Sequence, residues 1–344
     1  ELYGQETVPP DLPNIPEMLR ARGYRTLGVA ANVHLEGEFG FARGFDRYSC
    51  PGFVSAEHVV DIVRTWTPDV TSQQPFFAWV HFLDPHEPYE PREPWLTEFL
   101  AGRPHHPELD SQPAGSFAQI GLSGERLDYV KTLYDSEIRH TDERLAEVLR
   151  LLRVTDDDLV IFTSDHGEEF GEHGLFQHGR SLNEASVRIP LIVRYPRREL
   201  AGQTSAAPVS IMDVFPTILQ VVGSPAPSGL DGTTLSAAQR VDPENPTPIL
   251  LELFRRDQHL RALVLAPWKL IVDLKRPAQP RLFDLRQEPT EDADLAPSST
   301  ETVVRLQNVL TDYLAAQKSR PAAQTQQALT PKQIDQLRAM GYLQ

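Results

Sequence analysis

The chain has 344 residues, of which 40% are hydrophobic and 24% charged, a composition typical of globular proteins. Its net charge of −15 and the lack of a long basic run argue against nucleic acid as a partner, so local cations must hold any anionic ligand. The apolar runs have strand length, far short of the roughly 20 residues that a membrane helix needs. The only cysteine, Cys50, excludes an internal disulfide framework and a four-cysteine zinc site.

The first half of the chain predicts strands that alternate with helices. Short apolar runs that follow polar loops predict strands, and apolar residues at helical spacing predict one long amphipathic helix. A region rich in Pro, Gly and His predicts a surface excursion. The expected elements are a helix at 16–22, strands at 25–30 and 76–82, the excursion at 96–125, and the long helix at 126–153.

In the second half, the alternation of predicted strands and helices ends at about residue 236. Strands at 158–163 and 189–193 and a helix at 211–222 continue the alternation before that point. Short strand-like runs separated by turns follow it, and they predict a small antiparallel sheet. The last expected elements are strands at 249–254, 261–265, 268–272 and 281–284, a helix at 302–316, a flexible linker at 317–330 and a helix at 331–340.

This alternation predicts an α/β fold with a mixed, mostly parallel sheet covered by helices on both faces. We expect a catalytic domain at residues 1–235, a small C-terminal antiparallel subdomain at 236–298, and C-terminal helices with a linker at 299–344. The chain begins at Glu1 rather than at methionine. The sequence therefore leaves the compartment open between periplasmic or secreted and cytoplasmic.

Three predicted strands are followed by a histidine or an Asp-His pair. The strand at 25–30 leads to His34, the strand at 76–82 to His86, and the strand at 158–163 to Asp165 and His166. If these strands are parallel neighbours, their ends meet at one edge of the sheet, where ligands of α/β proteins bind. A loop with His178 and Arg180 follows. Together these groups suit a tetrahedral oxyanion held beside a metal.

Each residue alone also has a simpler interpretation. A lone histidine after a strand is often a solvated loop residue, and Asp165 could be a helix N-cap. Glu168, Glu169 and Glu172 read as a solvated acidic face, and Cys50 lacks the cationic surroundings of a reactive thiolate. The joint occurrence of these residues at strand ends favours a site.

Short motifs spread over nearly the whole chain resemble the sulfatase family of the alkaline phosphatase superfamily, and bacterial arylsulfatases in particular. Their order and spacing are family-like. The clearest is Thr163-Ser-Asp-His-Gly-Glu-Glu-Phe-Gly-Glu-His-Gly174. The others lie at residues 19–26, 40–46, 75–89, 134–142, 186–190, 213–217, 282–285 and 337–342.

The resemblance implies roles for seven residues. Asp165 and His166 match the second pair of metal ligands, for one divalent ion that is calcium in most of the family; an imidazole at 166 also suits magnesium or manganese. His86 matches the leaving-group histidine and His34 a histidine near the nucleophile. Asn32 stands where the family has a substrate-binding lysine. His178 and Arg180 bracket a second lysine position, and the three histidines are the candidate catalytic residues.

The family's first strand, with two further metal ligands, and its Cys/Ser-x-Pro-Ser-Arg nucleophile segment have no counterpart here. Cys50-Pro-Gly-Phe-Val does not match that segment. We therefore expect the chain to lack roughly the first strand–helix unit, with a formylglycine nucleophile upstream of it.

The resemblance implies hydrolysis of a small-molecule or glycan sulfate ester by the intact protein, and an inactive chain as given. Two alternatives stay open. One is a phosphate or phosphonate ester hydrolase of the same superfamily, and the other is a non-catalytic remnant.

Overall fold

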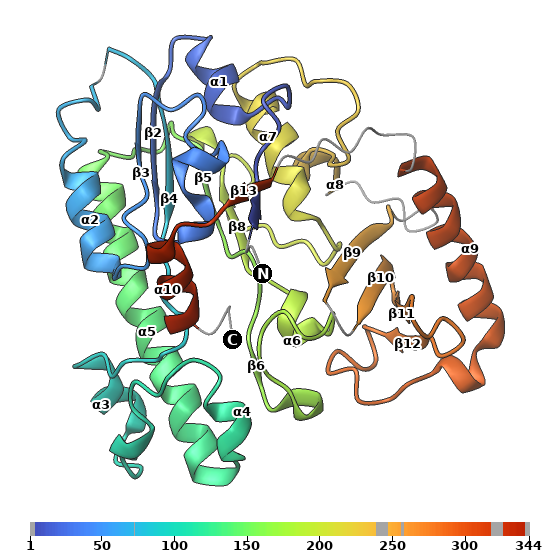
Figure 1. The fold of residues 1–344 in the computed structure, drawn as a ribbon. Helices are drawn as coiled ribbons and strands as arrows, with labels where there is room; N and C mark the ends of the chain where they lie inside the picture. The colour runs from blue at the N-terminus through green and yellow to red at the C-terminus, as the bar shows by residue number, and fades with distance from the viewer. Residues whose placement is uncertain (1–3, 72, 239–246, 256–257, 318–325, 341–344) are drawn as a thin grey trace. The chain divides into compact units, whose positions relative to one another are not determined.

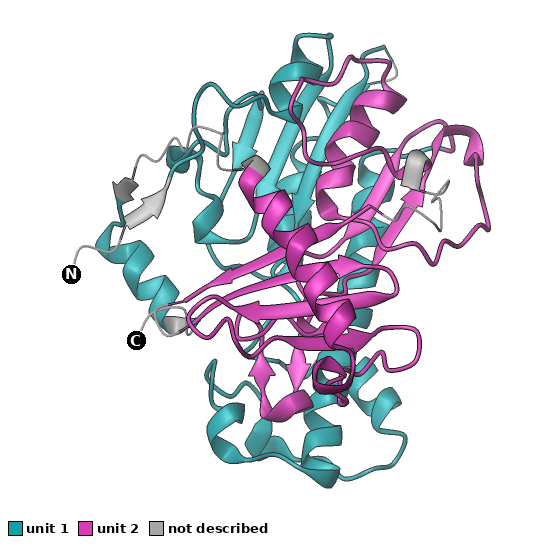
Figure 2. Cartoon of the chain, turned by 90° about the vertical axis from the view of Figure 1, so that its right-hand side faces the viewer, with its two compact units in different colours: residues 1–155, 323–344 teal, residues 156–322 magenta. Residues whose placement is uncertain are grey.

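The computed structural model describes residues 4–71, 73–238, 247–255, 258–317 and 326–340. The chain divides into two compact units, residues 1–155 with 323–344, and residues 156–322 (Figure 2). Each unit has its own sheets and its own hydrophobic core. The predicted domain bounds at residues 235 and 298 remain predictions.

The first unit is built on a parallel sheet with the strand order β3-β2-β4 (Figure 1). The strands are β2 at Arg25–Ala30, β3 at Arg47–Ser49 and β4 at Phe76–His81. Helices α2 (Ala56–Arg64) and α5 (Gly124–Leu151) pack against this sheet. Apolar residues at helical spacing in α2, such as Val59 and Val63, meet the fully buried Leu27 and Val29 of β2. The predicted strands at 25–30 and 76–82 are confirmed as parallel neighbours.

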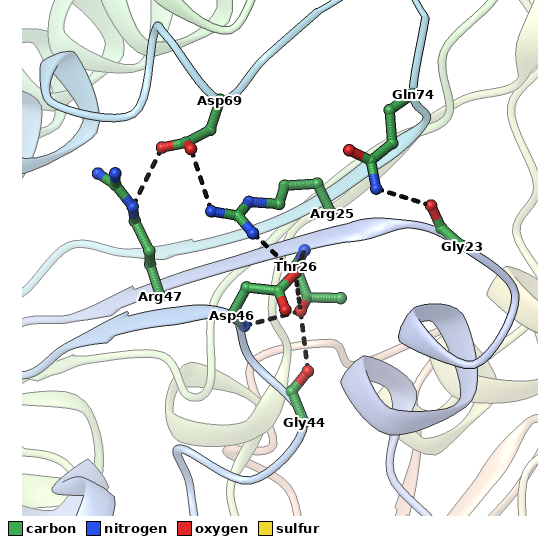
Figure 3. A network of polar contacts seen from close by, with 8 residues as sticks. All are labelled: Gly23, Arg25, Thr26, Gly44, Asp46, Arg47, Asp69 and Gln74. Atoms are coloured by element: carbon green, nitrogen blue, oxygen red, sulfur yellow. Dashed lines mark hydrogen bonds and ion pairs between the residues drawn. The ribbon is translucent and has the colours of Figure 1, made fainter.

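A polar network fixes the N-terminal end of this sheet (Figure 3). The Asp46 carboxylate accepts a hydrogen bond of 2.9 Å from the Thr26 backbone N–H. Asp69 lies 3.0 Å from a guanidinium nitrogen of Arg25 and 3.1 Å from Nε of Arg47. These contacts join β2 to β3 and to the segment before β4, so the three strands start in a fixed register, and the carboxyl ends of β2 and β4 lie side by side.

The remaining elements of the first unit are short. The helix α1 begins after Asn14, whose side chain accepts a hydrogen bond from the Glu17 N–H. Helix α10 is capped by Thr330. The elements are β1 at Gly4–Glu6, α1 at Ile15–Arg20, α3 at Trp95–Leu100, α4 at Phe117–Ile120, β13 at Gln326–Ala328, α10 at Pro331–Ala339, and the 3-10 helices η1 at Val33–Leu35, η2 at Gly37–Phe39 and η3 at Pro107–Leu109.

Two predictions for this unit need correction. The predicted surface excursion at 96–125 contains most of α3 and all of α4, and its Leu109 and Phe117 are buried, so it does not lie wholly on the surface. Within the predicted linker 317–330, residues 318–325 lie outside the described residues, but 326–328 form β13, which pairs with β1. Backbone pairing with a distant strand is a long-range effect that local composition does not encode.

The second unit starts with β5 (Val160–Thr163), which pairs antiparallel with β8 (Leu191–Arg194). Between them lies a small hairpin of β6 (Glu169–Phe170) and β7 (Phe176–Gln177). The helices that accompany these strands are α6 at Glu184–Val187, α7 at Val214–Val221 and α8 at Leu235–Ala238, with 3-10 turns η4 at Glu172–Gly174, η5 at Pro196–Arg198 and η6 at Ile211–Asp213.

The predicted C-terminal antiparallel sheet is confirmed, with the order β12-β11-β10-β9. Its elements are β9 at Ile249–Phe254, β10 at His259–Leu265, β11 at Trp268–Asp273, β12 at Arg281–Asp284, η7 at Ala296–Ser298 and α9 at Thr300–Gln317. One face of the sheet packs on α9 through Leu263 and Leu306. The other face, with Leu251 and Leu253, packs on Leu182.

The chain therefore has the predicted mixed α/β fold, with a parallel sheet and a small C-terminal antiparallel sheet. Within the described parts of the chain, none of the helices combines the length and the apolar character required to span a bilayer.

Candidate functional site

The segment after β2 carries the first two candidates, Asn32 and His34. Asn32 caps η1, because its Oδ1 accepts a hydrogen bond of 3.0 Å from the His34 backbone N–H. His34 is half-buried, and burial lowers the pKa of its imidazole, so the ring is neutral near pH 7. The Asn32 side chain therefore has a structural task, and its contact with substrate stays a prediction.

His86 lies in a loop that an ion pair closes. Asp84, three residues after β4, and Arg92 are 2.8 Å apart, with exposed side-chain fractions of 6% and 17%. The buried Glu87 accepts a hydrogen bond of 2.8 Å from the Gly115 N–H. Nδ1 of His86 lies 2.6 Å from the Glu87 carbonyl. Because a carbonyl can only accept, Nδ1 carries the proton, and Nε2 is left as the acceptor nitrogen.

Asp165 and His166 follow β5 in the second unit, in a turn that only glycine can complete. The Gly167 N–H donates to the Ser186 carbonyl at 2.8 Å. A Cβ on Gly167 would lie 2.1 Å from the Ala185 carbonyl oxygen. The turn therefore packs directly on the backbone of α6. The Asp165 side chain is 67% exposed, and its Oδ1 accepts from the His166 backbone N–H at 3.0 Å.

Replacing Gly167 by alanine is expected to lower the free energy of unfolding by about 2–3 kcal/mol, because the new methyl group displaces α6 from the turn. Gly174→Ala is the matched control. Gly174 has a φ of +72° and open space around it, so that variant loses only about 1 kcal/mol to its backbone conformation. Urea denaturation of both variants measures the difference. An equal loss of unfolding free energy in the two variants would show that the close contact between Gly167 and α6 adds nothing to the cost of the substitution.

The β6–β7 hairpin brings Glu168 and His178 together. Glu169 pairs with Gln177, so the next position outward places Glu168 opposite His178. Nδ1 of His178 lies 2.8 Å from the Glu168 carboxylate, whose side chain is only 7% exposed. The His178 ring also stacks on the His166 ring, with centroids 3.8 Å apart and an interplanar angle of 21°.

His166, Glu168 and His178 form a candidate metal cluster. Each offers one ligand atom within 4.8 Å of the other two, and all three residues are partly buried. Nδ1 of His166 lies 2.8 Å from the Gly167 carbonyl, so this nitrogen also carries a proton and directs the Nε2 lone pair away from the backbone. Two imidazoles and a carboxylate suit a divalent first-row ion better than calcium, which prefers oxygen ligands.

The interpretation of Glu168 as part of a solvated acidic face was wrong. Its carboxylate is nearly enclosed and engaged by His178. The sequence shows an acidic run, but only the hairpin register selects Glu168 as the partner of a histidine ten residues later. Glu169, also buried, turns the other way and accepts a hydrogen bond of 2.9 Å from Ser181.

Arg180 and Cys50 complete the candidates. The Arg180 guanidinium lies 3.3 Å from the side-chain oxygen of Gln177, the last residue of β7 and three residues before Arg180. Burial raises the pKa of the Cys50 thiol, and its sulfur donates to the Asn32 carbonyl at 3.2 Å. A thiol held in its protonated form is a poor nucleophile, in agreement with the sequence interpretation.

The candidates thus form two groups, one in each unit. The first holds Asn32, His34 and His86, and the second holds Asp165, His166, His178 and Arg180. Within the second group the structure brings His166 and His178 into contact. The predicted meeting of all three strand ends, and each assigned catalytic, substrate or metal role, stay predictions.

The sulfatase family model matches residues 2–224, and the model of the C-terminal part of N-sulphoglucosamine sulphohydrolase matches residues 171–319. Among curated proteins, the chain is 28% identical over 249 residues to a choline-sulfatase of Rhizobium meliloti, covering 66% of this chain and 48% of that protein. The chain spans about half the length of the curated relatives it matches.

Two solved structures share the fold. One is a protein in complex with its substrate D-glucosamine-2-N,6-O-disulfate, with a TM-score of 0.66, 17% identity, and coverage of 91% of this chain and 83% of that one. The other is the phosphonate monoester hydrolase of Agrobacterium radiobacter, with a TM-score of 0.66, 20% identity, and coverage of 95% and 84%. The resemblance stated from the motifs is confirmed, and the chain belongs to the sulfatase family.

Proposed function

We propose that this chain forms part of a hydrolase that cleaves sulfate esters at a divalent-metal site. The observation that carries the proposal is the His166–Glu168–His178 cluster, which lies within the residues that the sulfatase model matches. Imidazoles and a carboxylate that cluster on a loop after a strand are typical of a site that transfers an anionic group, and they are uncommon in a packed core.

The orientation of the two rings supports this role. Glu168 holds the proton of His178 on Nδ1, and the Gly167 carbonyl does the same for His166. Both rings then keep Nε2 as a lone-pair donor, the form that binds a metal ion or takes a proton. A bound divalent ion would act as a Lewis acid on the ester oxygens. His166 and His178 would hold it through Nε2, Glu168 would orient the His178 ring, and the exposed Asp165 carboxylate would be a further oxygen ligand.

The other candidates keep the roles that the family resemblance implies. His86, with its proton on Nδ1, would need a second proton on Nε2 to protonate a leaving alcohol. His34, kept neutral by burial, would donate a hydrogen bond rather than a full charge. Arg180 would then provide the main cation for a sulfate group, and Asn32 a polar contact. We take the nucleophile, the formylglycine of the family, to lie outside these 344 residues.

Metal binding is the first test. The purified chain is expected to bind one manganese or zinc ion, measured by calorimetry after dialysis, and to bind calcium more weakly. Glu168→Gln and His178→Ala are each expected to lower the affinity by about 10–100-fold, since each removes a ligand or the group that orients it. His105→Ala, which changes a histidine with a half-exposed side chain in the other unit, should leave the affinity unchanged. Equal affinity in all variants would reject the site.

The substrate class is the second test. In the presence of the bound ion, sulfate and an aryl sulfate are expected to bind more tightly than phosphate and a phenyl phosphonate. Arg180→Ala should weaken sulfate binding by about tenfold, the loss of one charge-assisted contact. A preference for the phosphonate would instead favour a phosphonate ester hydrolase, which the likeness to the Agrobacterium enzyme and the Asp165-His166 pair support. Binding without turnover of any ester is the outcome for a non-catalytic chain.

A further inference from the structure

His178 is held in an unusual stretch of backbone. Gln177 before it has a φ of +71° and Gly179 after it a φ of +67°, so left-handed conformations lie on both sides of the ring. Such a conformation costs a residue with a side chain about 1–2 kcal/mol. The loop keeps this shape only if contacts outside the hairpin hold it.

The turn between β9 and β10 supplies those contacts. The Arg255 guanidinium donates a hydrogen bond of 2.9 Å to the Gly179 carbonyl. The Gln258 side-chain amide donates one of 2.7 Å to the Arg180 carbonyl. The two carbonyls are consecutive along the chain and directly follow His178. Two side chains of one turn therefore bind the backbone of the segment that carries His178 and Arg180.

The C-terminal sheet directs Arg255 toward this loop. Leu251 and Leu253 of β9 point to the face that packs on Leu182. Arg255, two residues after Leu253, continues the same alternation and reaches the neighbouring Gly179. The turn itself is closed by a backbone hydrogen bond of 2.9 Å from the Arg255 N–H to the Gln258 carbonyl. The support is thus anchored in a packed sheet.

A second contact holds the opposite end of the hairpin. Asn183 Nδ2 donates to Nδ1 of His173 at 2.8 Å, and Nε2 of His173 lies 3.1 Å from the Glu291 carbonyl. His173 is in η4, at the tip between β6 and β7. Because this contact is independent of the β9–β10 turn, His173 serves as an internal reference for the integrity of the hairpin.

We propose that Arg255 and Gln258 are positioning residues that hold the His178–Arg180 loop in its site conformation. They act through the Gly179 and Arg180 carbonyls, and they would neither touch the metal nor the ester. The value of this role for hydrolysis rests on the proposed function, but the positioning itself does not. The C-terminal antiparallel sheet thereby becomes part of the site's architecture.

The test observes the ring proton on Nδ1 of His178, which hydrogen-bonds to Glu168. Nuclear magnetic resonance of the chain with ¹⁵N-labelled histidine detects this proton. In Arg255→Ala/Gln258→Ala this proton is expected to lose its resonance or to exchange at least about tenfold faster, as a loosened hydrogen bond requires. The Nε2 proton of His173 should be unchanged. Arg255→Lys keeps a cationic donor at this position, so the His178 ring proton should exchange more slowly in it than in the double variant. Arg276→Ala, in the turn between β11 and β12 of the same sheet, is the control.

Metal affinity provides a second readout. The double variant is expected to bind manganese about tenfold more weakly, and to have no further effect in a His178→Ala background, since it acts through that ring. Unchanged His178 protection in the double variant, or equal loss at His178 and His173, overturns the proposal. If the parent chain binds no metal, the proposed function fails, while the proton resonances still decide the positioning role.

Discussion

Replacing Lys269 by methionine is expected to lower the free energy of unfolding of the second unit by about 3–5 kcal/mol. Lys269 has no exposed side-chain area, and its Nζ lies 2.7 Å from Glu184 Oε1 and 2.9 Å from Glu291 Oε1. Glu291 is equally buried, and it also accepts a hydrogen bond of 2.6 Å from the Glu184 N–H. Removal of the lysine leaves these carboxylates without their cation in a dry environment.

Urea denaturation, monitored by hydrogen exchange of backbone amides, measures this loss of stability separately in each unit. The exposed Lys275, six residues further along, provides the control, and Lys275→Met should change the free energy of unfolding by less than about 0.5 kcal/mol. Adding Glu184→Gln and Glu291→Gln to Lys269→Met should recover part of the stability, because the uncompensated charges disappear. A Lys269→Met variant as stable as the control would mean that water reaches these carboxylates.

This buried group also shows where sequence reasoning stops. The strand at 268–272 was predicted from its apolar residues, and nothing in that pattern marks Lys269 as a buried cation. Its partners come from α6 and from the loop after β12, so no local pattern relates them. Long-range charge pairing, unlike amphipathic spacing, leaves no periodicity in the sequence.

The elements predicted from periodicity fared better. The long helix at 126–153 is α5, and the four short C-terminal strands are β9 to β12, because each has apolar residues at the spacing of its own structure. Helix α2 was missed, although its Val59, Val60 and Val63 are buried. The β6–β7 hairpin was missed as well, since two-residue strands carry no alternation to detect.

The sequence predicted the histidines of the candidate site but not the residues that contact them. His166 and His178 stand out because they follow strand-like runs and belong to family motifs. Glu168, Arg255 and Gln258 do not stand out, since acidic and polar residues are common in loops. Their roles depend on the hairpin register and on the return of the C-terminal sheet to the same loop. These are tertiary relations, which one sequence without its fold does not reveal.

The last prediction concerns Glu137, a carboxyl buried in α5 beside the loop of His86. Its side chain is 2% exposed, and burial raises its pKa to about 8, with a further upward contribution from the nearby Asp84. The Glu90 N–H, which donates to Oε1 at 3.0 Å, and Arg92, at 3.7 Å, act in the opposite direction. Within the described residues, the buried Oε2 has no hydrogen-bond partner, which disfavours a negative charge on this carboxyl.

Because the folded-state pKa lies above the ordinary value of 4.5, the folded chain binds this proton more tightly than the unfolded chain does. The resulting stabilisation is fully present below about pH 4.5 and is lost as the pH rises through about 8, a change of a few kcal/mol. Glu137→Gln keeps an acceptor for the Glu90 N–H and has no proton to lose. The variant should therefore gain stability relative to the parent chain between pH 6 and pH 9.

Urea midpoints of both chains across that range measure the gain, and the difference between the two curves removes every other titrating group from the comparison. Glu125→Gln, an exposed position on the same helix, should run parallel to the parent chain at all pH values. Parallel curves for Glu137→Gln would show that Glu137 is ionised in the folded chain. In that case Arg92 would neutralise two carboxylates, Asp84 and Glu137, and the loop of His86 would be held by two ion pairs rather than by one.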